Sequence, residues 1–147
     1  GRERSRPSGE VIREIELLVE EGVVEVSLLG QNVNRYGLDR PNDLTFHGLL
    51  RKINDIKGLR RVRFITSQPA SLDDDTVNLF GQLETLCESI HLPFQSGSDR
   101  ILNFMERGYT RKEYLEKIEK LRKRVPEIAL SADVIVGFPG ETERDFH

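Results

Sequence analysis

The sequence lacks cysteine pairs, long apolar runs and an excess of basic residues. Its 147 residues contain one cysteine, Cys87, which excludes an internal disulfide and a cysteine-based metal cluster within this chain. A lone free thiol is typical of a reducing compartment. No apolar run approaches the roughly 20 residues that span a bilayer, and no secretory signal pattern opens the sequence. We therefore expect a cytoplasmic protein with no membrane partner.

The charge balance limits what the chain can bind by itself. With 22 Lys and Arg against 25 Asp and Glu, its net charge is −3, which excludes a basic surface over the whole chain. A local basic arm remains at residues 1–7. It is either a solvated leader or a contact for phosphate or carboxylate groups, which Arg binds in planar, bidentate geometry.

Helical and strand-like patterns alternate along the chain. Apolar spacing predicts helices over residues 8–21, 46–56, 71–86, 99–105 and 110–125, and strands over 23–29, 61–66, 89–93 and 128–136. Strands that alternate with helices form parallel sheets with right-handed crossovers. The expected fold class is therefore α/β with parallel strands.

Capping signals mark where several of these helices begin. Ser71 precedes three acidic residues, which suit a positive helix end better than a metal site. Ser98 precedes the fourth helix, and Thr110 with Glu113 forms a capping box. Thr142 announces another helix that would run past His147. We therefore expect the chain to be a piece of a larger protein.

A polar loop follows each predicted strand. Gln31 follows the first, Ser67 the second, Gln95 and Ser96 the third, and Gly137 the fourth. Ordinary turns account for each loop alone. Parallel topology, however, brings the carboxyl ends of all four strands to one edge, where α/β proteins bind ligands. We therefore expect one composite site.

Asp133 lies inside the last predicted strand. A carboxylate in a buried strand is costly unless it is paired or functional. It is therefore either a site residue or a structural hydrogen-bond hub.

Six motifs, in order along the whole chain, together resemble one family, the radical S-adenosylmethionine methylthiotransferases, and in particular its tRNA-modifying branch. The motifs are GRERSRP (1–7), LLGQNVN (28–34), RFITS (63–67), HLPFQSGSD (91–99), MERGYT (105–110) and DVIVGFPGETE (133–143). One departure is visible, because Gln68 stands where a His is expected. Gln can hydrogen-bond but cannot titrate near neutral pH.

The resemblance implies a partial (β/α) barrel of the radical SAM type, truncated at both ends. Residues 1–147 would be the central part of the core domain, without its first and last βα units. In the family, a CxxxCxxC loop just upstream of the Arg-rich motif holds a [4Fe–4S] cluster by three thiolates. Those cysteines would lie upstream of Gly1, so this chain should hold no metal and should be inactive alone.

The resemblance also implies a function for the parent protein. It would be a transferase that adds a methylthio group to an isopentenylated adenosine next to the tRNA anticodon. Its partners would be tRNA, S-adenosylmethionine and an electron donor. The alternatives are a methylthiotransferase for threonylcarbamoyl-adenosine tRNA or a ribosomal protein, and a non-catalytic, barrel-derived interaction module.

The family pattern further implies roles for individual residues in binding S-adenosylmethionine. Catalytic side chains are not assigned, because the cofactor carries the hard chemistry. Gln31 is expected near the methionine moiety, Gln95 and Ser96 near the ribose, Gly137, Gly140 and Glu141 near the adenine, and Ser67 and Asp133 facing either the cofactor or the substrate.

Overall fold

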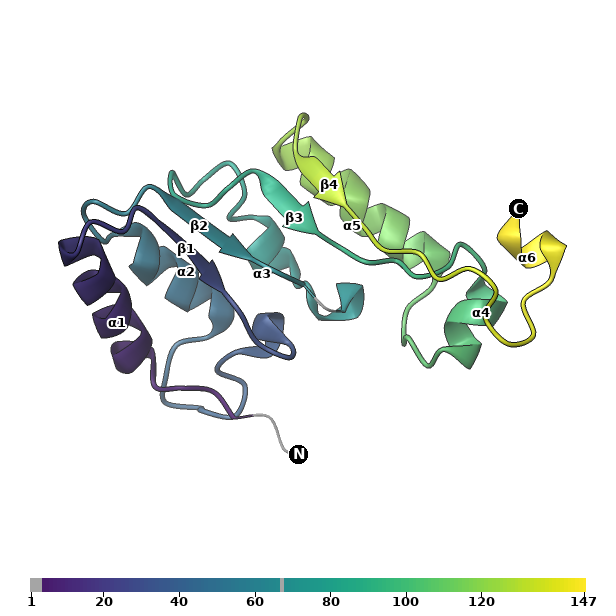
Figure 1. The fold of residues 1–147 in the computed structure, drawn as a ribbon, viewed down its shortest axis with the longest axis horizontal. Coiled ribbons are helices and arrows are strands. Elements are labelled where there is room, and N and C mark those ends of the chain that lie inside the picture. The colour runs from purple at the N-terminus through teal and green to yellow at the C-terminus, as the bar shows by residue number, and fades with distance from the viewer. Residues whose placement is uncertain (1–3, 67) are drawn as a thin grey trace.

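The structure, a computed structural model, describes residues 4–66 and 68–147. Helices and strands alternate along the chain, as expected (Figure 1). The strands are β1 (Glu25–Leu28), β2 (Arg61–Phe64), β3 (Ser89–His91) and β4 (Ala129–Ser131). The helices are α1 (Ser8–Glu20), α2 (Phe46–Asn54), α3 (Asp74–Val77), α4 (Asp99–Phe104), α5 (Arg111–Arg124) and α6 (Glu143–Phe146), with 3-10 turns η1 (Val33–Arg35) and η2 (Pro69–Ser71).

The four strands pair in parallel, which confirms the expected α/β class with parallel strands. β1 pairs with β2, where Leu28 lies opposite Phe64. β3 pairs with β4, where His91 lies opposite Ser131. A single parallel bridge between Ile65 and His91 helps to join the two ladders. All four carboxyl ends therefore point the same way, toward the loops that carry the predicted site residues.

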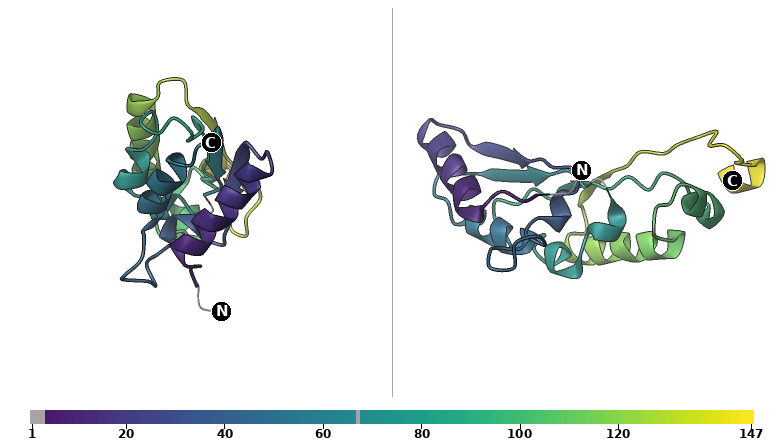
Figure 2. Two further views of the ribbon diagram at one scale, coloured as in Figure 1. Left: turned by 90° about the vertical axis from the view of Figure 1, so that its left-hand side faces the viewer. Right: turned by 90° about the horizontal axis from the view of Figure 1, so that it is seen from below.

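Helices cover one side of the strands. α1, α2, α3 and α5 lie on that side, and the other side is bare (Figure 2). Burial along β2 agrees, since Val62 and Phe64 are buried while Arg61 and Arg63 are exposed. On the bare side, Glu25 accepts hydrogen bonds from both of these arginines, with 2.8 Å between its Oε1 and Arg63 Nε.

The core lies between the helices and the strands. Phe64 of β2 packs edge-on against Phe46 of α2, with ring centroids 5.0 Å apart, and lies 6.0 Å from Phe80. The apolar stripe of α2 turns toward this cluster, since Leu50 and Ile53 are fully buried. The buried face of α2 is therefore the one that its apolar spacing predicts.

The helix expected after Ser71 is shorter than predicted. Ser71 ends η2, and Asp73 instead caps α3 by accepting a hydrogen bond from the Thr76 amide at 2.7 Å. Helical structure stops early because residues 78–85 form turns and bends, where Gly81 adopts a φ of 72°. Apolar spacing alone does not distinguish such buried turns from a helix.

The strand expected over residues 128–136 is also wrong in length. β4 ends at Ser131, and residues 131–137 are exposed. Beyond Ser131 the chain keeps one parallel bridge, between Gln95 and Val134. The apolar run in this segment therefore lies on the bare side of the fold rather than in its core.

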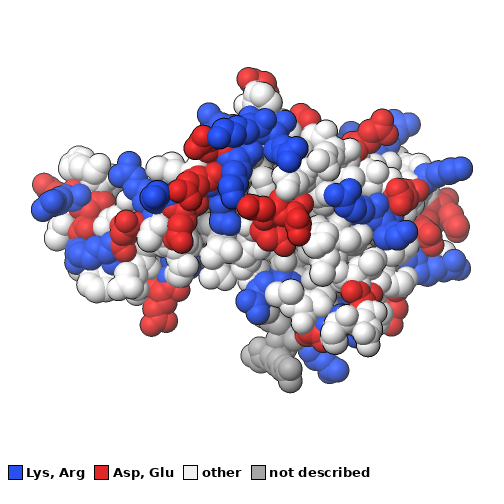
Figure 3. All heavy atoms as spheres, turned by 180° about the vertical axis from the view of Figure 1, so that it is seen from behind, with Lys and Arg blue, Asp and Glu red and all other residues white. Residues whose placement is uncertain are grey.

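The surface carries charges of both signs. Figure 3 shows acidic and basic side chains mixed over the face opposite to that of Figure 1. The basic end of α5 forms local pairs, because Lys120 lies 2.8 Å from Asp74 and Arg124 donates to Asn78 Oδ1 at 2.6 Å. Within residues 4–66 and 68–147, no helix is long and apolar enough to cross a membrane.

Candidate functional site

Gln31 lies in the loop that follows β1. This loop lines a cavity of about 790 Å³, together with Asn32, Arg4 and Tyr36. The cavity opens beside the edge of β1, the first strand of the ladder. Its wall combines apolar side chains such as Leu28 with polar and charged ones such as Gln31 and Asp39, so it offers a small molecule both apolar contacts and hydrogen bonds.

Gln95 is held in an unusual backbone conformation. Its φ is 66°, and its side chain is buried. Its amide donates to the Asp133 carbonyl at 3.0 Å, and its carbonyl accepts from the Ile135 amide at 2.8 Å. A residue other than glycine at positive φ stores strain, which concentrates at functional sites. These bonds place Gln95 directly beside Asp133.

Asp133 is not the buried strand carboxylate that the sequence predicts. Its side chain is 73% exposed, and it follows β4 instead of lying within it. Its Oδ2 lies 3.3 Å from His91 Nε2, while His91 Nδ1 lies 2.9 Å from Ser131 Oγ. The imidazole is thus held from both sides on the bare face of the fold. His91 is a residue that the sequence analysis missed.

Ser96 lies in the turn between β3 and α4. It is 4% exposed, and its Oγ accepts a hydrogen bond from the Ser98 amide at 3.2 Å. Ser98 in turn caps α4 by accepting from the Ile101 amide. Ser96 therefore shapes the loop, while the backbone of its neighbour Gln95 bonds the Asp133 segment.

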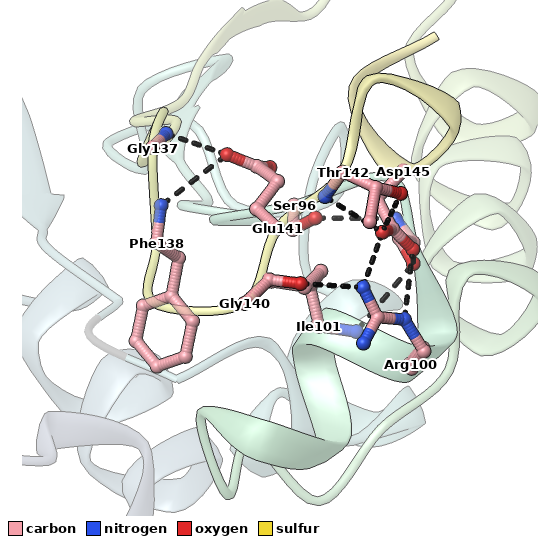
Figure 4. A network of polar contacts seen from close by, with 10 residues as sticks. Ser96, Arg100, Ile101, Gly137, Phe138, Gly140, Glu141, Thr142 and Asp145 are labelled. Atoms are coloured by element: carbon pink, nitrogen blue, oxygen red, sulfur yellow. Dashed lines mark hydrogen bonds and ion pairs between the residues drawn. The ribbon is translucent and has the colours of Figure 1, made fainter.

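The loop at residues 137–141 is built around two glycines and a carboxylate (Figure 4). Gly137 and Gly140 have φ values of 76° and 85°, which L side chains rarely adopt. The Glu141 carboxylate accepts hydrogen bonds from the amides of Gly137, at 2.5 Å, and Phe138, at 3.3 Å. Glu141 therefore holds the loop closed from within.

A polar cluster joins the loops after β1 and β2. It is formed by Asn32, Gln68, Ser71 and Arg107. Asn32 Nδ2 donates to Ser71 Oγ at 3.0 Å and to Gln68 Oε1 at 3.5 Å, and Gln68 Nε2 donates to the Arg107 carbonyl at 3.4 Å. In the described part of the chain, Asn32 Oδ1 and Arg107 Nε are buried without a hydrogen-bond partner. Such orphaned groups mark places where a ligand or water completes the bonding.

The sequence analysis names Gln68 as a departure from the family pattern, but it assigns no site role to Asn32, Ser71 or Arg107. Asn32 and Gln68 follow predicted strands, which is the signal that points to them. Arg107 follows a helix, so no strand-end signal marks it. Ser67, predicted for the same edge, lies outside the described residues.

The predicted site residues thus fall into separate groups. Gln95 and Asp133 lie together, the 137–141 loop follows them, and Gln31 lines the cavity beside β1. Most of these groups are amides, hydroxyls and backbone. The described residues contain no cluster of three His, Cys, Asp or Glu side chains that could hold a metal ion. Amides and hydroxyls of this kind can bind and orient a ligand by hydrogen bonds.

Comparison with known families places the fold. The model of the radical SAM superfamily matches residues 1–147. The chain belongs to the radical SAM superfamily. Two radical SAM structures share its fold: TsrM from Kitasatospora setae, solved with cobalamin and a [4Fe–4S] cluster, with a TM-score of 0.66 at 20% identity over 95% of this chain and 27% of that one, and OxsB, solved with aqua-cobalamin, with a TM-score of 0.59 at 13% identity over 88% of this chain and 19% of that one.

Among curated radical SAM relatives, the similarity is much higher. Proteins named tRNA-2-methylthio-N(6)-dimethylallyladenosine synthase match over 146 residues, or 99% of this chain. The identity is 53% for Syntrophotalea carbinolica, 54% for a Sulfurihydrogenibium species and 55% for Caldicellulosiruptor saccharolyticus. The chain spans 33%, 33% and 31% of these relatives' lengths, respectively.

Proposed function

We propose that this chain is the central part of the core domain of a tRNA methylthiotransferase, which adds a methylthio group to dimethylallyl-adenosine beside the anticodon. The observation that carries this proposal is the identity of 53% over 146 residues to synthases named for that product. The relatives are about three times as long as the chain. The activity is therefore assigned to the full-length protein, and the chain alone should be inactive.

The fold of the parent core would be a partial (β/α) barrel, of which residues 1–147 supply the central strands. Four parallel strands in chain order support this, as do helices confined to one side. The bare side would then be the barrel interior. Its charged ladder of Glu25, Arg61 and Arg63 lies toward the amino ends of the strands, and its exposed Ile65 lies toward the carboxyl ends.

The residues at the carboxyl edge suit S-adenosylmethionine. Its ammonium group would donate to the orphaned Asn32 Oδ1, and its carboxylate would accept from Arg107 Nε. Gln31 would contact the methionine moiety from the adjoining cavity, and Gln95 the ribose. The open backbone of the 137–141 loop would face the adenine. S-adenosylmethionine, when bound and reduced, supplies a radical that removes hydrogen from an unreactive C–H bond.

A [4Fe–4S] cluster requires three thiolates at its S-adenosylmethionine site, and the chain has one cysteine, so its ligands would come from another part of the protein. We extend the proposal to the location and the partners of the full-length protein. The protein would be cytoplasmic, and an electron donor would reduce its cluster. Because the net charge of the chain is −3, the main tRNA contacts would lie outside these residues.

One experiment tests the proposed function. The full-length protein is reconstituted with iron and sulfide without oxygen, and is supplied with reductant, S-adenosylmethionine and tRNA. Mass spectrometry of the digested tRNA should detect a methylthio group only when the adenosine already carries its dimethylallyl group. Modification of threonylcarbamoyl-adenosine instead would overturn the proposed substrate. The same reactions are assayed for 5′-deoxyadenosine, the product of reductive cleavage of S-adenosylmethionine, and its absence would overturn the proposed reaction class. The 147-residue chain, assayed alongside, is the inactive control.

A further inference from the structure

Arg100 connects α4 to two neighbouring segments, the 137–141 loop and α6, that lie far from it in sequence. It is the second residue of α4, and its Nη2 donates to the Gly140 carbonyl at 2.7 Å (Figure 4). Its Nε lies 3.2 Å from Asp145 Oδ1, and Nη2 also bonds the other oxygen of that carboxylate. The guanidinium also lies 5.2 Å from the centre of the Phe104 ring. Arg100 therefore joins α4 to the 137–141 loop and to α6.

Asp145 is fixed from more than one side. Besides Arg100, it accepts hydrogen bonds from Ser98 Oγ at 2.7 Å, and from the amide and hydroxyl of Thr142 at 3.0 and 2.6 Å. Its side chain is 11% exposed. The Arg100 guanidinium, with these hydroxyls and the amide, holds the pKa of Asp145 well below its usual range. The carboxylate that anchors Arg100 is thus charged at neutral pH.

The 137–141 loop needs an external tie. Among the described residues, the hydrogen bonds of the Glu141 carboxylate stay within the loop, at the amides of Gly137 and Phe138. A Cβ added at Gly137 would meet no atom within 4 Å, so side-chain packing does not brace that end. The bond from Arg100 to Gly140 reaches the loop from α4, an element anchored by the buried Ile101 and Leu102.

We propose that Arg100 is a positioning residue for S-adenosylmethionine, which it orients through the backbone of the 137–141 loop. This inference rests on the proposed function, because that function puts the adenine against the loop. Arg100 contacts the loop at the Gly140 carbonyl and would act on the cofactor through it. A bidentate guanidinium can hold the Gly140 carbonyl and the Asp145 carboxylate together, whereas an ammonium is a compact point charge with no such fork.

A purely structural ion pair is the competing explanation. Arg100 is 45% exposed, and exposed pairs contribute little to stability. If this explanation held, replacing Arg100 would leave cofactor affinity unchanged. If Arg100 positions the loop, affinity falls while the fold remains, because α4 keeps its cap from Ser98.

The test uses Arg100→Ala, Arg100→Lys and a matched control, Arg124→Ala, in the reconstituted full-length protein. Arg124 also donates a side-chain hydrogen bond, to Asn78, but at the far end of α5. We expect Arg100→Ala to raise the S-adenosylmethionine Kd about tenfold or more, with a smaller fall in kcat at saturating cofactor. Arg100→Lys should recover part of the affinity, and Arg124→Ala should match the wild type.

Hydrogen–deuterium exchange supplies a readout that needs no turnover. Amides of residues 137–142 should exchange about tenfold faster in Arg100→Ala, while those of α1 stay unchanged. Equal Kd and equal loop exchange in Arg100→Ala and Arg124→Ala would overturn the inference. Faster exchange with an unchanged Kd would overturn it too, since the loop would then move without consequence for the cofactor. A wild type that does not bind S-adenosylmethionine would instead refute the proposed function.

Discussion

The Asp133 carboxylate lies 3.3 Å from His91 Nε2. His91 ends β3, and Asp133 follows β4, the strand that pairs with β3. On the other side of the ring, Ser131 Oγ lies 2.9 Å from Nδ1. A neighbouring carboxylate favours the tautomer that carries its proton on Nε2, because that N–H donates to the carboxylate. Both side chains stand on the bare face, near the carboxyl ends of β3 and β4.

The first prediction concerns this pair. Asp133→Asn in the full-length protein keeps the shape of the side chain but removes its charge. We expect the S-adenosylmethionine Kd or the tRNA KM to rise about tenfold, while the melting temperature stays within about 2 °C, since the carboxylate is largely exposed. Asp75→Asn, an exposed acid on α3, is the matched control. Cofactor and tRNA parameters equal to those of the control would exclude a role for Asp133.

The second prediction separates strain from binding at Gln95. Its φ of 66° favours glycine, so Gln95→Gly should be more stable than Gln95→Ala by about 1 kcal/mol. Both variants lose the side-chain amide, so both should bind S-adenosylmethionine about tenfold more weakly. Urea unfolding measures the first difference and equilibrium dialysis the second. If both variants bind as tightly as the wild type, the strained backbone at Gln95 does not serve the cofactor.

The sequence predicted this site only in part, and the reasons are physical. Strand-end loops are recognisable because turn residues follow apolar runs, and parallel pairing then brings Gln95 beside Asp133. The exposure of residues 131–137 was not recognisable, because an apolar run on the bare side of the strands has the same sequence pattern as a core strand. Arg107 gives no local signal, since its place in the polar cluster depends on tertiary contacts.

The helix ends were likewise predicted correctly in one case and wrongly in another. Thr110 and Glu113 form the predicted capping box, because both partners lie within one turn of each other. The predicted cap of α3 was Ser71, but the observed cap is Asp73. Ser and Asp cap helices about equally well, so the sequence does not distinguish them, and in the structure Ser71 belongs to the η2 turn.

The third prediction concerns the aromatic core. Phe64 is 5% exposed and contacts the rings of Phe46 and Phe80. Phe64→Ala should lower the free energy of unfolding by about 3–5 kcal/mol, through lost apolar burial and a residual cavity. Leu38→Ala, at a side chain that is 65% exposed, should change it by no more than about 0.5 kcal/mol. Equal urea midpoints for the two variants would contradict the packing described for β2.

The last prediction concerns acid stability at the start of α1. Pro7 cannot cap this helix by its side chain, and Asp43 from a distant loop accepts hydrogen bonds from the Ser8 hydroxyl and from its amide at 3.0 Å. These bonds, with others from the Leu44 amide and Arg40, hold the pKa of the Asp43 carboxyl well below 3.8. A negative charge is also favourable at the positive end of a helix.

The sign of the pH effect follows from that depressed pKa. The folded protein keeps Asp43 ionised where the unfolded chain would bind a proton, so its stabilising contribution is complete above about pH 4 and declines as the pH falls further. Asp43→Asn should therefore lower the urea midpoint at pH 7 and flatten its fall between about pH 4 and pH 2.5. Glu16→Gln, on the exposed side of α1, serves as the control. An acid slope as steep in Asp43→Asn as in Glu16→Gln would show that the Ser8–Asp43 contact does not contribute to acid stability.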